Sequence, residues 1–203
     1  RVTAALEQAM QRLGLQAPFF ISQNDGTLMA PREIGQYPVL TFASGPTNSM
    51  RGAAFLSGLP DALVVDIGGT TSDVGVLAKG FPRQAGMAVR LAGVRTNFRM
   101  PDLLAIGLGG GSLVREATDG TVTIGPDSVG YRLTEEALVF GGSTLTTTDI
   151  AVAAGMADIG DRSKVAHLSA PLVTRSLMRI RQMLETAIDR VKTSADPVPV
   201  VLV

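Results

Sequence analysis

Apolar residues recur along this 203-residue chain with two periods, and the longer period predicts helices. Apolar positions three and four residues apart predict amphipathic helices over residues 2–13 and 169–193. Ser44-Gly45-Pro46-Thr47 contains strong turn formers, so we expect the chain to break there and a third helix to begin near residue 48. Acidic residues in a first turn favour helix starts at residues 134 and 148.

The shorter apolar runs predict strands. Residues 62–65 and 74–77 are uninterrupted apolar runs, which are typical of buried central strands. A third strand is expected at residues 87–91, with no helix between the three, so we predict an antiparallel meander. Another strand is expected at residues 198–203, where the chain ends.

A short hairpin is predicted nearer the start. Residues 19–22 and 27–29 flank Asn24-Asp25-Gly26, and these residue types tolerate the backbone angles of a tight turn. Residues 38–42 are also apolar and predict a strand.

The motif that carries the most chemistry joins the two central strands: Asp66-Ile67-Gly68-Gly69-Thr70-Thr71-Ser72-Asp73. The two glycines let backbone N–H groups face an anion with no side chain in the way, which predicts a phosphate-binding turn. The two threonines add hydroxyl donors. The first aspartate can hold Mg²⁺ through a water, because magnesium favours carboxylates, waters and phosphates. A plain tight turn, with both aspartates as turn formers, is the alternative interpretation.

Composition narrows the classes of partner. Eighteen basic residues balance eighteen acidic ones, so neither nucleic acid nor a membrane surface is expected as a partner. The chain has no cysteine, which excludes disulfides and thiolate sites and favours a cytoplasmic location. No apolar run approaches the roughly 20 residues of a membrane helix. With His167 as the only histidine, a histidine-based zinc site or a catalytic triad is not expected.

Several long stretches resemble known families. The phosphate motif, with the small-residue helix before it, is similar to the connecting helix and second phosphate loop of the actin, Hsp70 and sugar-kinase ATPases. More specifically, the chain resembles the hydantoinase A and 5-oxoprolinase family, nearly end to end. That resemblance rests on Gln23-Asn24-Asp25-Gly26-Thr27-Leu28-Met29, Gly93-Val94-Arg95-Thr96-Asn97-Phe98-Arg99-Met100-Pro101-Asp102, Ile106-Gly107-Leu108-Gly109-Gly110-Gly111-Ser112 and Thr147-Thr148-Asp149-Ile150-Ala151.

The resemblance implies an α/β fold of the ribonuclease-H-like type, with a mixed sheet and flanking helices. It also implies ATP-dependent hydrolysis of a cyclic amide or imide, such as a hydantoin or 5-oxoproline. ATP and Mg²⁺ are the implied cofactors, with Mg²⁺ at Asp66 and the phosphates at Gly68 to Thr71 and Asp73. The implied partner is a hydantoinase B-type subunit or domain.

In the superfamily, ATP lies between two similar domains, held by a phosphate hairpin from each and by a glycine-rich adenosine loop. One such hairpin is present here. We therefore expect a segment of a longer subunit: residues 1–45 as the tail of domain I, 46–60 as the connecting helix, and 61–203 as domain II, ending before the adenosine loop. Such a segment is expected to be inactive alone.

Two other functions fit the same residues. The first is a subunit of an ATP-dependent carboxylase acting on a ketone such as acetone or acetophenone. The second is a non-enzymatic ATPase-like module that switches shape on binding nucleotide. Product analysis separates the first from a hydrolase, and ATP turnover independent of any small substrate marks the second.

Weaker site candidates lie outside the phosphate motif. Arg95 and Asp102 could contact a phosphate or substrate, or could form a surface salt bridge. Gly109-Gly110-Gly111-Ser112 could bring the backbone close to a substrate or permit a sharp bend. Asp149 could serve the site or cap a helix.

Overall fold

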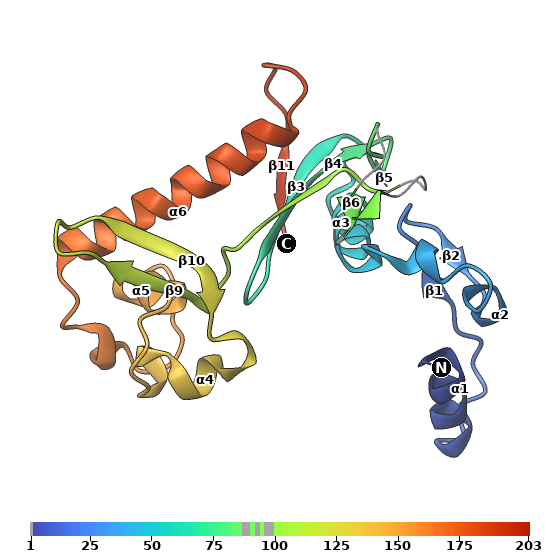
Figure 1. Ribbon diagram of the computed structural model, residues 1–203, viewed down its shortest axis with the longest axis horizontal. Helices are drawn as coiled ribbons and strands as arrows, with labels where there is room; N and C mark the ends of the chain where they lie inside the picture. The colour runs from blue at the N-terminus through green and yellow to red at the C-terminus, as the bar shows by residue number, and fades with distance from the viewer. Residues whose placement is uncertain (1, 87–89, 92–93, 96–99) are drawn as a thin grey trace. The chain divides into compact units, whose positions relative to one another are not determined.

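The computed structural model describes residues 2–86, 90–91, 94–95 and 100–203. Its ribbon is shown in Figure 1. The chain divides into two compact units, Arg1–Ala62 with Gly75–Asp102, and Leu63–Val74 with Leu103–Val203.

The first unit consists of short helices and hairpins. Its helical elements are α1 (Val2–Arg12), α2 (Pro31–Ile34), the 3₁₀ helix η1 (Pro38–Thr41) and α3 (Ser44–Ser57). Its strands are β1 (Ile21–Ser22), β2 (Leu28–Met29), β5 (Phe81–Pro82), β6 (Arg90–Leu91) and β7 (Val94–Arg95). The predicted hairpin is confirmed, because β1 and β2 pair in antiparallel register with Ile21 opposite Met29.

Two local predictions for this unit are wrong. Residues 38–42 form η1 rather than a strand, with the Leu40 amide donating to the Tyr37 carbonyl at 3.1 Å. The Leu40 carbonyl accepts from the Asn24 amide at 2.7 Å, so this segment braces the first hairpin. Helix α3 begins at Ser44 and not near residue 48, because Pro46 falls in the first turn, where amide groups have no intrahelical acceptor.

The second unit is a sheet with a helical and hairpin layer. Its strands are β3 (Ala62–Ile67), β4 (Ser72–Ala78), β8 (Leu103–Ile106), β9 (Ser112–Glu116), β10 (Val122–Ser128) and β11 (Val200–Leu202). Its helical elements are η2 (Gly130–Arg132), α4 (Leu133–Glu136), η3 (Leu138–Phe140), α5 (Thr147–Ala153), η4 (Arg162–Val165) and α6 (Ala170–Val191).

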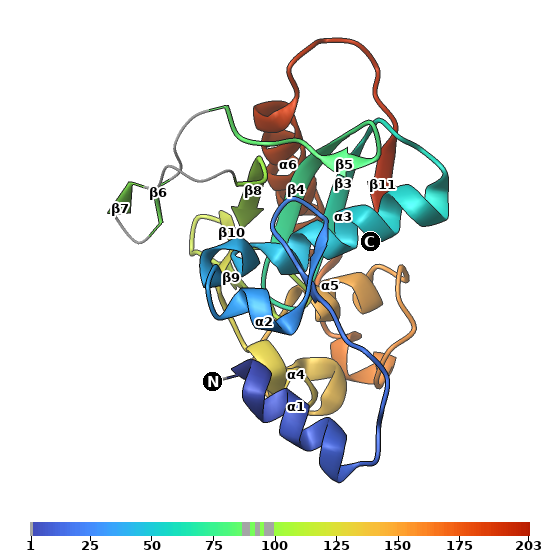
Figure 2. The same cartoon turned by 90° about the vertical axis from the view of Figure 1, so that its right-hand side faces the viewer.

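The sheet is mixed, as predicted. Strands β3 and β4 are neighbours joined by a four-residue turn, and therefore run in opposite directions. Strand β11 pairs with β3 in parallel register, with Val201 opposite Val64, and lies beside it in Figures 1 and 2. Strand β4 passes from this unit into the first unit, where Leu77 pairs with Pro82 of β5. Residues 87–89 of the predicted third strand lie outside the described residues.

Helix α6 provides much of the core of the second unit. Ser169 caps its first turn by accepting from the Leu172 amide at 3.3 Å. The predicted apolar face of α6 packs on the β9–β10 hairpin. Figure 1 shows the helix and the hairpin side by side. The buried residues of this cluster are Leu108, Val114, Val122, Ile124, Ile150 and Leu172. This packing places the start of β9, and the glycine segment before it, against a rigid layer.

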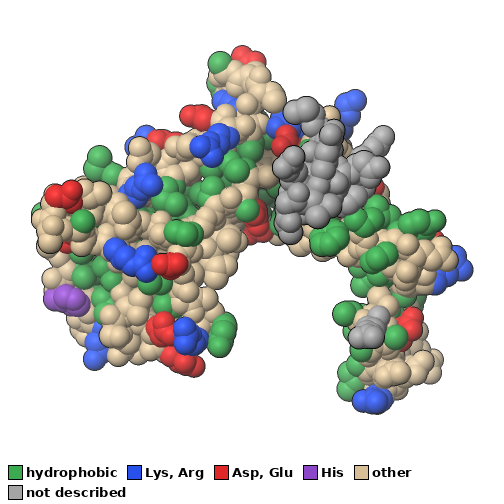
Figure 3. Space-filling view, viewed as in Figure 1, with side chains coloured by type: hydrophobic (Ala, Val, Ile, Leu, Met, Phe, Trp, Pro, Cys, Tyr) green, Lys and Arg blue, Asp and Glu red, His purple; other side chains and the backbone are tan. Residues whose placement is uncertain are grey.

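The surface carries both signs of charge. Figure 3 shows Lys and Arg side chains interspersed with Asp and Glu side chains on the face in view. His167 is exposed in the described structure. Among the described residues, no helix combines the length and the apolar character needed to cross a membrane.

Candidate phosphate-binding site

The turn between β3 and β4 is the centre of the candidate site. Buried Val64 and Val65 anchor β3, and the strand then emerges so that Asp66 is half-buried and Gly68 to Thr71 are exposed. The Gly68 amide donates to the Thr71 carbonyl at 2.9 Å and closes the turn. A rigid strand pair thus presents four exposed residues at one end of the sheet.

Three consecutive amides of this turn have no hydrogen-bond partner among the described residues. They belong to Gly69, Thr70 and Thr71, all of which are exposed. The threonine hydroxyls likewise have no protein partner in the described part of the chain. Adjacent N–H groups without partners can donate to an anion. The arrangement agrees with the phosphate-binding turn predicted from the sequence, whose ligand role stays a prediction.

The second glycine segment, residues 107–112, lies directly against this turn. The Gly110 amide donates to the Gly68 carbonyl at 3.0 Å, and the Gly111 amide donates to the Gly69 carbonyl at 2.7 Å. Ser72, fully buried, donates its hydroxyl to the Leu108 carbonyl at 2.6 Å. Two of these bonds occupy the carbonyls of Gly68 and Gly69 and fix the turn against the second glycine segment.

Steric space explains the glycines of the second segment. A Cβ atom at Gly109 would lie 2.6 Å from both the Gly68 oxygen and the Thr70 nitrogen, and one at Gly111 would lie 3.0 Å from the Gly69 oxygen. In the structure this segment lies close to the turn between β3 and β4, a contact that the sequence did not predict. Its proposed contact with substrate stays a prediction.

Gly69 differs from these supporting glycines. A Cβ atom there would meet no atom within 4 Å, and its φ is not in the left-handed region. The fold therefore does not require glycine at this position. A ligand that approaches the backbone closely would require it.

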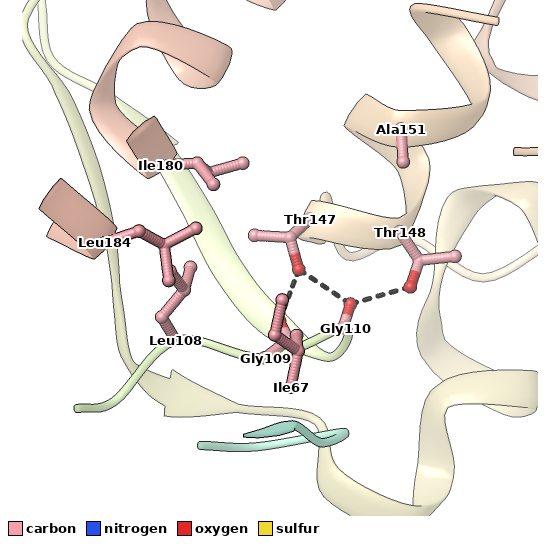
Figure 4. Close-up of a pocket in the computed structure, with 9 residues that line it drawn as sticks. All are labelled: Ile67, Leu108, Gly109, Gly110, Thr147, Thr148, Ala151, Ile180 and Leu184. Carbon is pink, nitrogen blue, oxygen red and sulfur yellow. Dashed lines mark hydrogen bonds between the residues drawn. The ribbon is translucent and has the colours of Figure 1, made fainter. Parts of the chain in front are cut away.

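Helix α5 fixes the glycine segment from the other side, as Figure 4 shows. Thr147 donates its hydroxyl to the Gly109 carbonyl and to the Gly110 carbonyl, the second at 2.8 Å. Thr148 donates its hydroxyl at 2.8 Å, and its amide at 3.0 Å, to the Gly110 carbonyl. The chain of support therefore runs from α5 to the glycine segment and from there to the phosphate turn.

Asp149 holds the first turn of α5. Its side chain is fully buried, and its carboxylate accepts from the Val139 amide at 2.8 Å, the Thr146 amide at 2.7 Å and the Thr146 hydroxyl at 2.8 Å. This is the capping role that the sequence offered as one alternative. Ser112, also fully buried, accepts from the Gly109 amide at 2.9 Å and shapes the glycine segment internally.

Two carboxylates flank the turn. Partial burial raises the pKa of the Asp73 carboxyl above its ordinary value, and the nearby charge of Asp66 raises it further. Neither side chain has a hydrogen-bond or ion-pair partner among the described residues. A cation would relieve this mutual repulsion.

The described residues contain no group of three or more His, Cys, Asp and Glu side chains placed for a metal. Mg²⁺ needs few protein ligands when phosphates and waters supply the rest, so the pair fits it.

Two other candidates belong to the first unit, whereas the turn belongs to the second. Asp102 belongs to the first unit, where it forms an ion pair with Arg83 at 2.7 Å. This is the salt bridge that the sequence left as the alternative to a ligand role. Arg95 lies in β7, and its side chain is outside the described part of the structure.

Sequence reasoning missed Ser72, Thr147 and Thr148 as supporting residues. The threonine run before Asp149 was the available signal. It gave no indication of a contact with residues 38 positions earlier in the chain.

An apolar cavity of about 200 Å³ opens beside this arrangement (Figure 4). Ile67 and Leu108 line it together with the glycine segment, the first residues of α5, and Ile180 and Leu184 of α6. The hydroxyls at its edge are bonded to backbone carbonyls, so the surface it offers is apolar.

The second unit is therefore an α/β domain with a mixed sheet, whose exposed glycine turn is supported by a second glycine segment. The family model of hydantoinase/oxoprolinase matches residues 1–193. The chain therefore belongs to the hydantoinase/oxoprolinase family.

Two curated relatives are similar to the chain. It is 29% identical over 119 residues to the acetophenone carboxylase gamma subunit of Aromatoleum aromaticum, covering 57% of this chain and 16% of that protein. It is 26% identical over 158 residues to the caprolactamase subunit alpha of Pseudomonas jessenii, covering 76% of this chain and 23% of that protein. The chain thus spans less than a quarter of either relative.

Two solved structures share the fold. Nucleotide-free acetone carboxylase matches with a TM-score of 0.64 and 21% identity, over 91% of this chain and 28% of that one. The ATP-dependent caprolactamase of Pseudomonas jessenii matches with a TM-score of 0.66 and 20% identity, over 95% of this chain and 31% of that one. The predicted α/β fold with a mixed sheet and flanking helices is confirmed.

Proposed function

We propose that the chain is part of an ATP-dependent hydrolase that opens a cyclic amide or imide, and that the turn between β3 and β4 holds ATP phosphates. The observation that carries the phosphate role is the donor set of Gly69, Thr70 and Thr71, three exposed amides without a partner among the described residues. The relatives supply the reaction class, because one of them is an ATP-dependent caprolactamase.

In this proposal the turn binds and orients the phosphates. The free amides and the hydroxyls of Thr70 and Thr71 donate to phosphate oxygens, and Gly69 lets the backbone approach them. Gly110 and Gly111 hold the carbonyls of Gly68 and Gly69, so the turn is fixed before a ligand arrives. Preorganised donors of this kind stabilise charge that develops during phosphoryl transfer.

Asp66 would hold Mg²⁺ through a water, with Asp73 as the adjacent carboxylate. When bound, Mg·ATP supplies a phosphoryl group that activates the substrate's carbonyl for attack by water and loss of the amide nitrogen. No nucleophile from this chain is required.

We further propose that the chain is a segment of a longer subunit: the tail of one domain (1–45), a connecting helix (46–60, most of which lies in α3) and most of a second domain (61–203). Its small share of the relatives' length supports this. A B-type partner subunit and a cytoplasmic location belong to the same proposal. The names of both curated relatives, as subunits, support a multi-subunit assembly.

The carboxylase alternative has specific support in the acetophenone and acetone carboxylases. The two reactions differ in their products. We expect ATP hydrolysis by the complete protein, with its partner subunit, to be stimulated by lactams or hydantoins and to yield the ring-opened product. Stimulation by a ketone with bicarbonate, and a carboxylated product, would select the alternative. Turnover unaffected by any of these compounds would select a switch module.

The phosphate role is tested by Asp66→Ala and Thr70→Val in the complete protein. Each is expected to abolish most nucleotide-coupled turnover. Thr70→Val removes one positioned donor, which costs on the order of 3 kcal/mol of transition-state stabilisation. Asp66→Ala removes the carboxylate proposed to hold Mg²⁺. Thr123→Val is the matched control, since Thr123 is an exposed threonine of β10 remote from the turn. Normal turnover in both test variants, with unchanged circular dichroism, would refute the phosphate role.

A further inference from the structure

The first unit contains a cavity that the phosphate site does not use. Its volume is about 340 Å³, within the range of small-molecule pockets, which begins at about 300 Å³. Asn24 and Asp25 line it from the first hairpin, Leu40 from η1, and Phe81, Pro82 and Gln84 from β5 and the residues after it. We call it the amide pocket. The Asn24-Asp25-Gly26 turn is part of a stretch that resembles the family, and the proposed function gives this turn no role.

The walls of the amide pocket are fixed by the fold. Asp25 Oδ1 accepts from the Thr27 amide at 2.9 Å and from the Thr27 hydroxyl at 2.7 Å. The Arg51 guanidinium stacks over the Phe81 ring, with Arg51 Cζ 4.0 Å from the ring centroid. A Cβ atom at Gly26 would lie 2.9 Å from Arg51 Cδ, so the turn is packed against the same arginine.

Gln84 is held between two backbone hydrogen bonds. The Ala85 amide donates to the Met100 carbonyl at 2.8 Å, and the Asp102 amide donates to the Arg83 carbonyl at 2.7 Å. The ion pair of Arg83 with Asp102 joins the same two segments. Asp102 is therefore a positioning residue for this wall of the pocket.

The Gln84 side chain has capacity for a ligand. Its Oε1 atom is buried and has no hydrogen-bond partner among the described residues. Its Nε2 atom makes one long bond, 3.4 Å, to the Pro82 carbonyl, which leaves its second hydrogen. A buried acceptor without a donor is costly, so a ligand that supplies an N–H group would be bound favourably.

Both signs of charge lie at the pocket. Asp25 is the one ionisable side chain among the described residues that line it, and the Arg51 guanidinium lies over the Phe81 ring of its wall, so the lining favours no net charge on a ligand. Leu40, Phe81 and Pro82 offer apolar surface beside the Gln84 amide. The ligand that fits is small, neutral and partly apolar, with an adjacent donor and acceptor.

We propose that the amide pocket binds the cyclic amide substrate through Gln84, an inference that rests on the proposed function. A lactam ring forces its amide into the cis form, so its N–H and C=O lie on the same side. The primary amide of Gln84 presents a C=O and an N–H in the same way. Two parallel hydrogen bonds result, from the lactam N–H to Oε1 and from Nε2 to the lactam carbonyl. Open-chain secondary amides are almost entirely trans and form only one of the two.

The test is a titration of the ¹⁵N-labelled chain with pyrrolidin-2-one and with caprolactam, followed by NMR without nucleotide. The side-chain amide signal of Gln84, assigned by its loss in Gln84→Met, is expected to shift and to saturate at millimolar lactam. N-methylpyrrolidinone lacks the N–H donor and is expected to bind at least tenfold more weakly. Equal binding of the N-methyl compound, or no shift of the Gln84 signal, would overturn the proposal.

Variants give a second measurement. Gln84→Met is expected to weaken lactam binding about tenfold, whereas Gln36→Met should leave it unchanged. Gln36 is an exposed glutamine of the same unit and does not line the pocket. Equal affinity in Gln84→Met and the native chain would also overturn the proposal. Should Gln84→Met fail to fold, the comparison of N-methylated and unmethylated lactam on the native chain decides.

The same measurements separate this proposal from the proposed function. Lactam-stimulated ATP hydrolysis by the complete protein, with no lactam signal at Gln84, would leave the hydrolase intact and refute the amide pocket. Lactam binding at Gln84, with normal turnover in Asp66→Ala and Thr70→Val, would refute the phosphate role instead. With both correct, Gln84→Met raises the KM for lactam in the complete protein and leaves the KM for ATP unchanged.

Discussion

Replacing Gly109 by alanine tests how the two glycine segments support each other. The added Cβ would lie 2.6 Å from the Gly68 oxygen, 2.6 Å from the Thr70 nitrogen and 2.7 Å from the Gly69 carbonyl carbon. All three are backbone atoms, so no side-chain rotation relieves the overlap. The φ angle of Gly109 is outside the left-handed region, so steric overlap alone opposes alanine there.

The size of the effect follows from the bonds that must open. The Cβ has to move from 2.6 Å to at least 3.4 Å, where van der Waals contact becomes ordinary. Such a movement breaks the bonds from Gly110 to Gly68, at 3.0 Å, and from Gly111 to Gly69, at 2.7 Å. Each is worth about 1 kcal/mol, and the lost packing adds to them, so Gly109→Ala should lower the free energy of unfolding by about 2 to 3 kcal/mol.

Urea unfolding of the chain, followed by circular dichroism, measures this change. Gly69→Ala is the matched control, because a Cβ there meets no atom within 4 Å. We expect it to change stability by less than about 0.5 kcal/mol, as for an ordinary surface substitution, while reducing nucleotide-coupled turnover in the complete protein. Equal stability of the Gly109→Ala and Gly69→Ala chains would contradict the proposed support between the segments.

Three further predictions follow from the second unit. Asp149→Asn replaces one carboxylate oxygen with an NH₂ group among three hydrogen-bond donors. The free energy of unfolding in urea should therefore fall by about 2 to 4 kcal/mol. A fall of less than about 1 kcal/mol would contradict the role of Asp149 as a buried cap. Asp73 has a raised pKa in the folded state, so the free energy of unfolding should fall as pH rises from the ordinary carboxyl value, 3.8, through the folded pKa. Asp73→Asn should remove that fall in urea midpoints taken from about pH 4 to about pH 7, and an unchanged profile would contradict it. Calorimetric titration of Mg·ATP into the chain alone should give a dissociation constant no lower than about 1 mM, which corresponds to a binding free energy of about 4 kcal/mol. The reason is that the contacts of a single phosphate hairpin must offset the whole cost of association. A micromolar dissociation constant would mean that the nucleotide site is complete in this chain.

The local elements were largely readable from the sequence. Residues 62–65 and the turn after them were recognisable because a buried strand must be apolar and a phosphate turn needs glycine. Helix α6 was predicted over residues 169–193, because its apolar period runs for about six turns, and the structure adds that Ser169 caps it. The strand predicted at residues 38–42 was wrong, because the segment forms the four-residue helix η1. An apolar run that short has too little periodicity to distinguish a strand from a helical turn.

The sequence by itself therefore determined which residues form the exposed turn between β3 and β4, because the pattern is local: glycines, hydroxyls and two carboxylates within eight positions. Tertiary structure decided what the second glycine segment does. Positions 109 and 111 have no room for a side chain, because Gly68 to Thr70, some 40 positions earlier, occupy the space beside them. Thr147 and Thr148, nearly 40 positions later, hold the carbonyls of Gly109 and Gly110 from helix α5. Contacts between such distant segments depend on how strands and helices pack, which no local pattern of residues encodes.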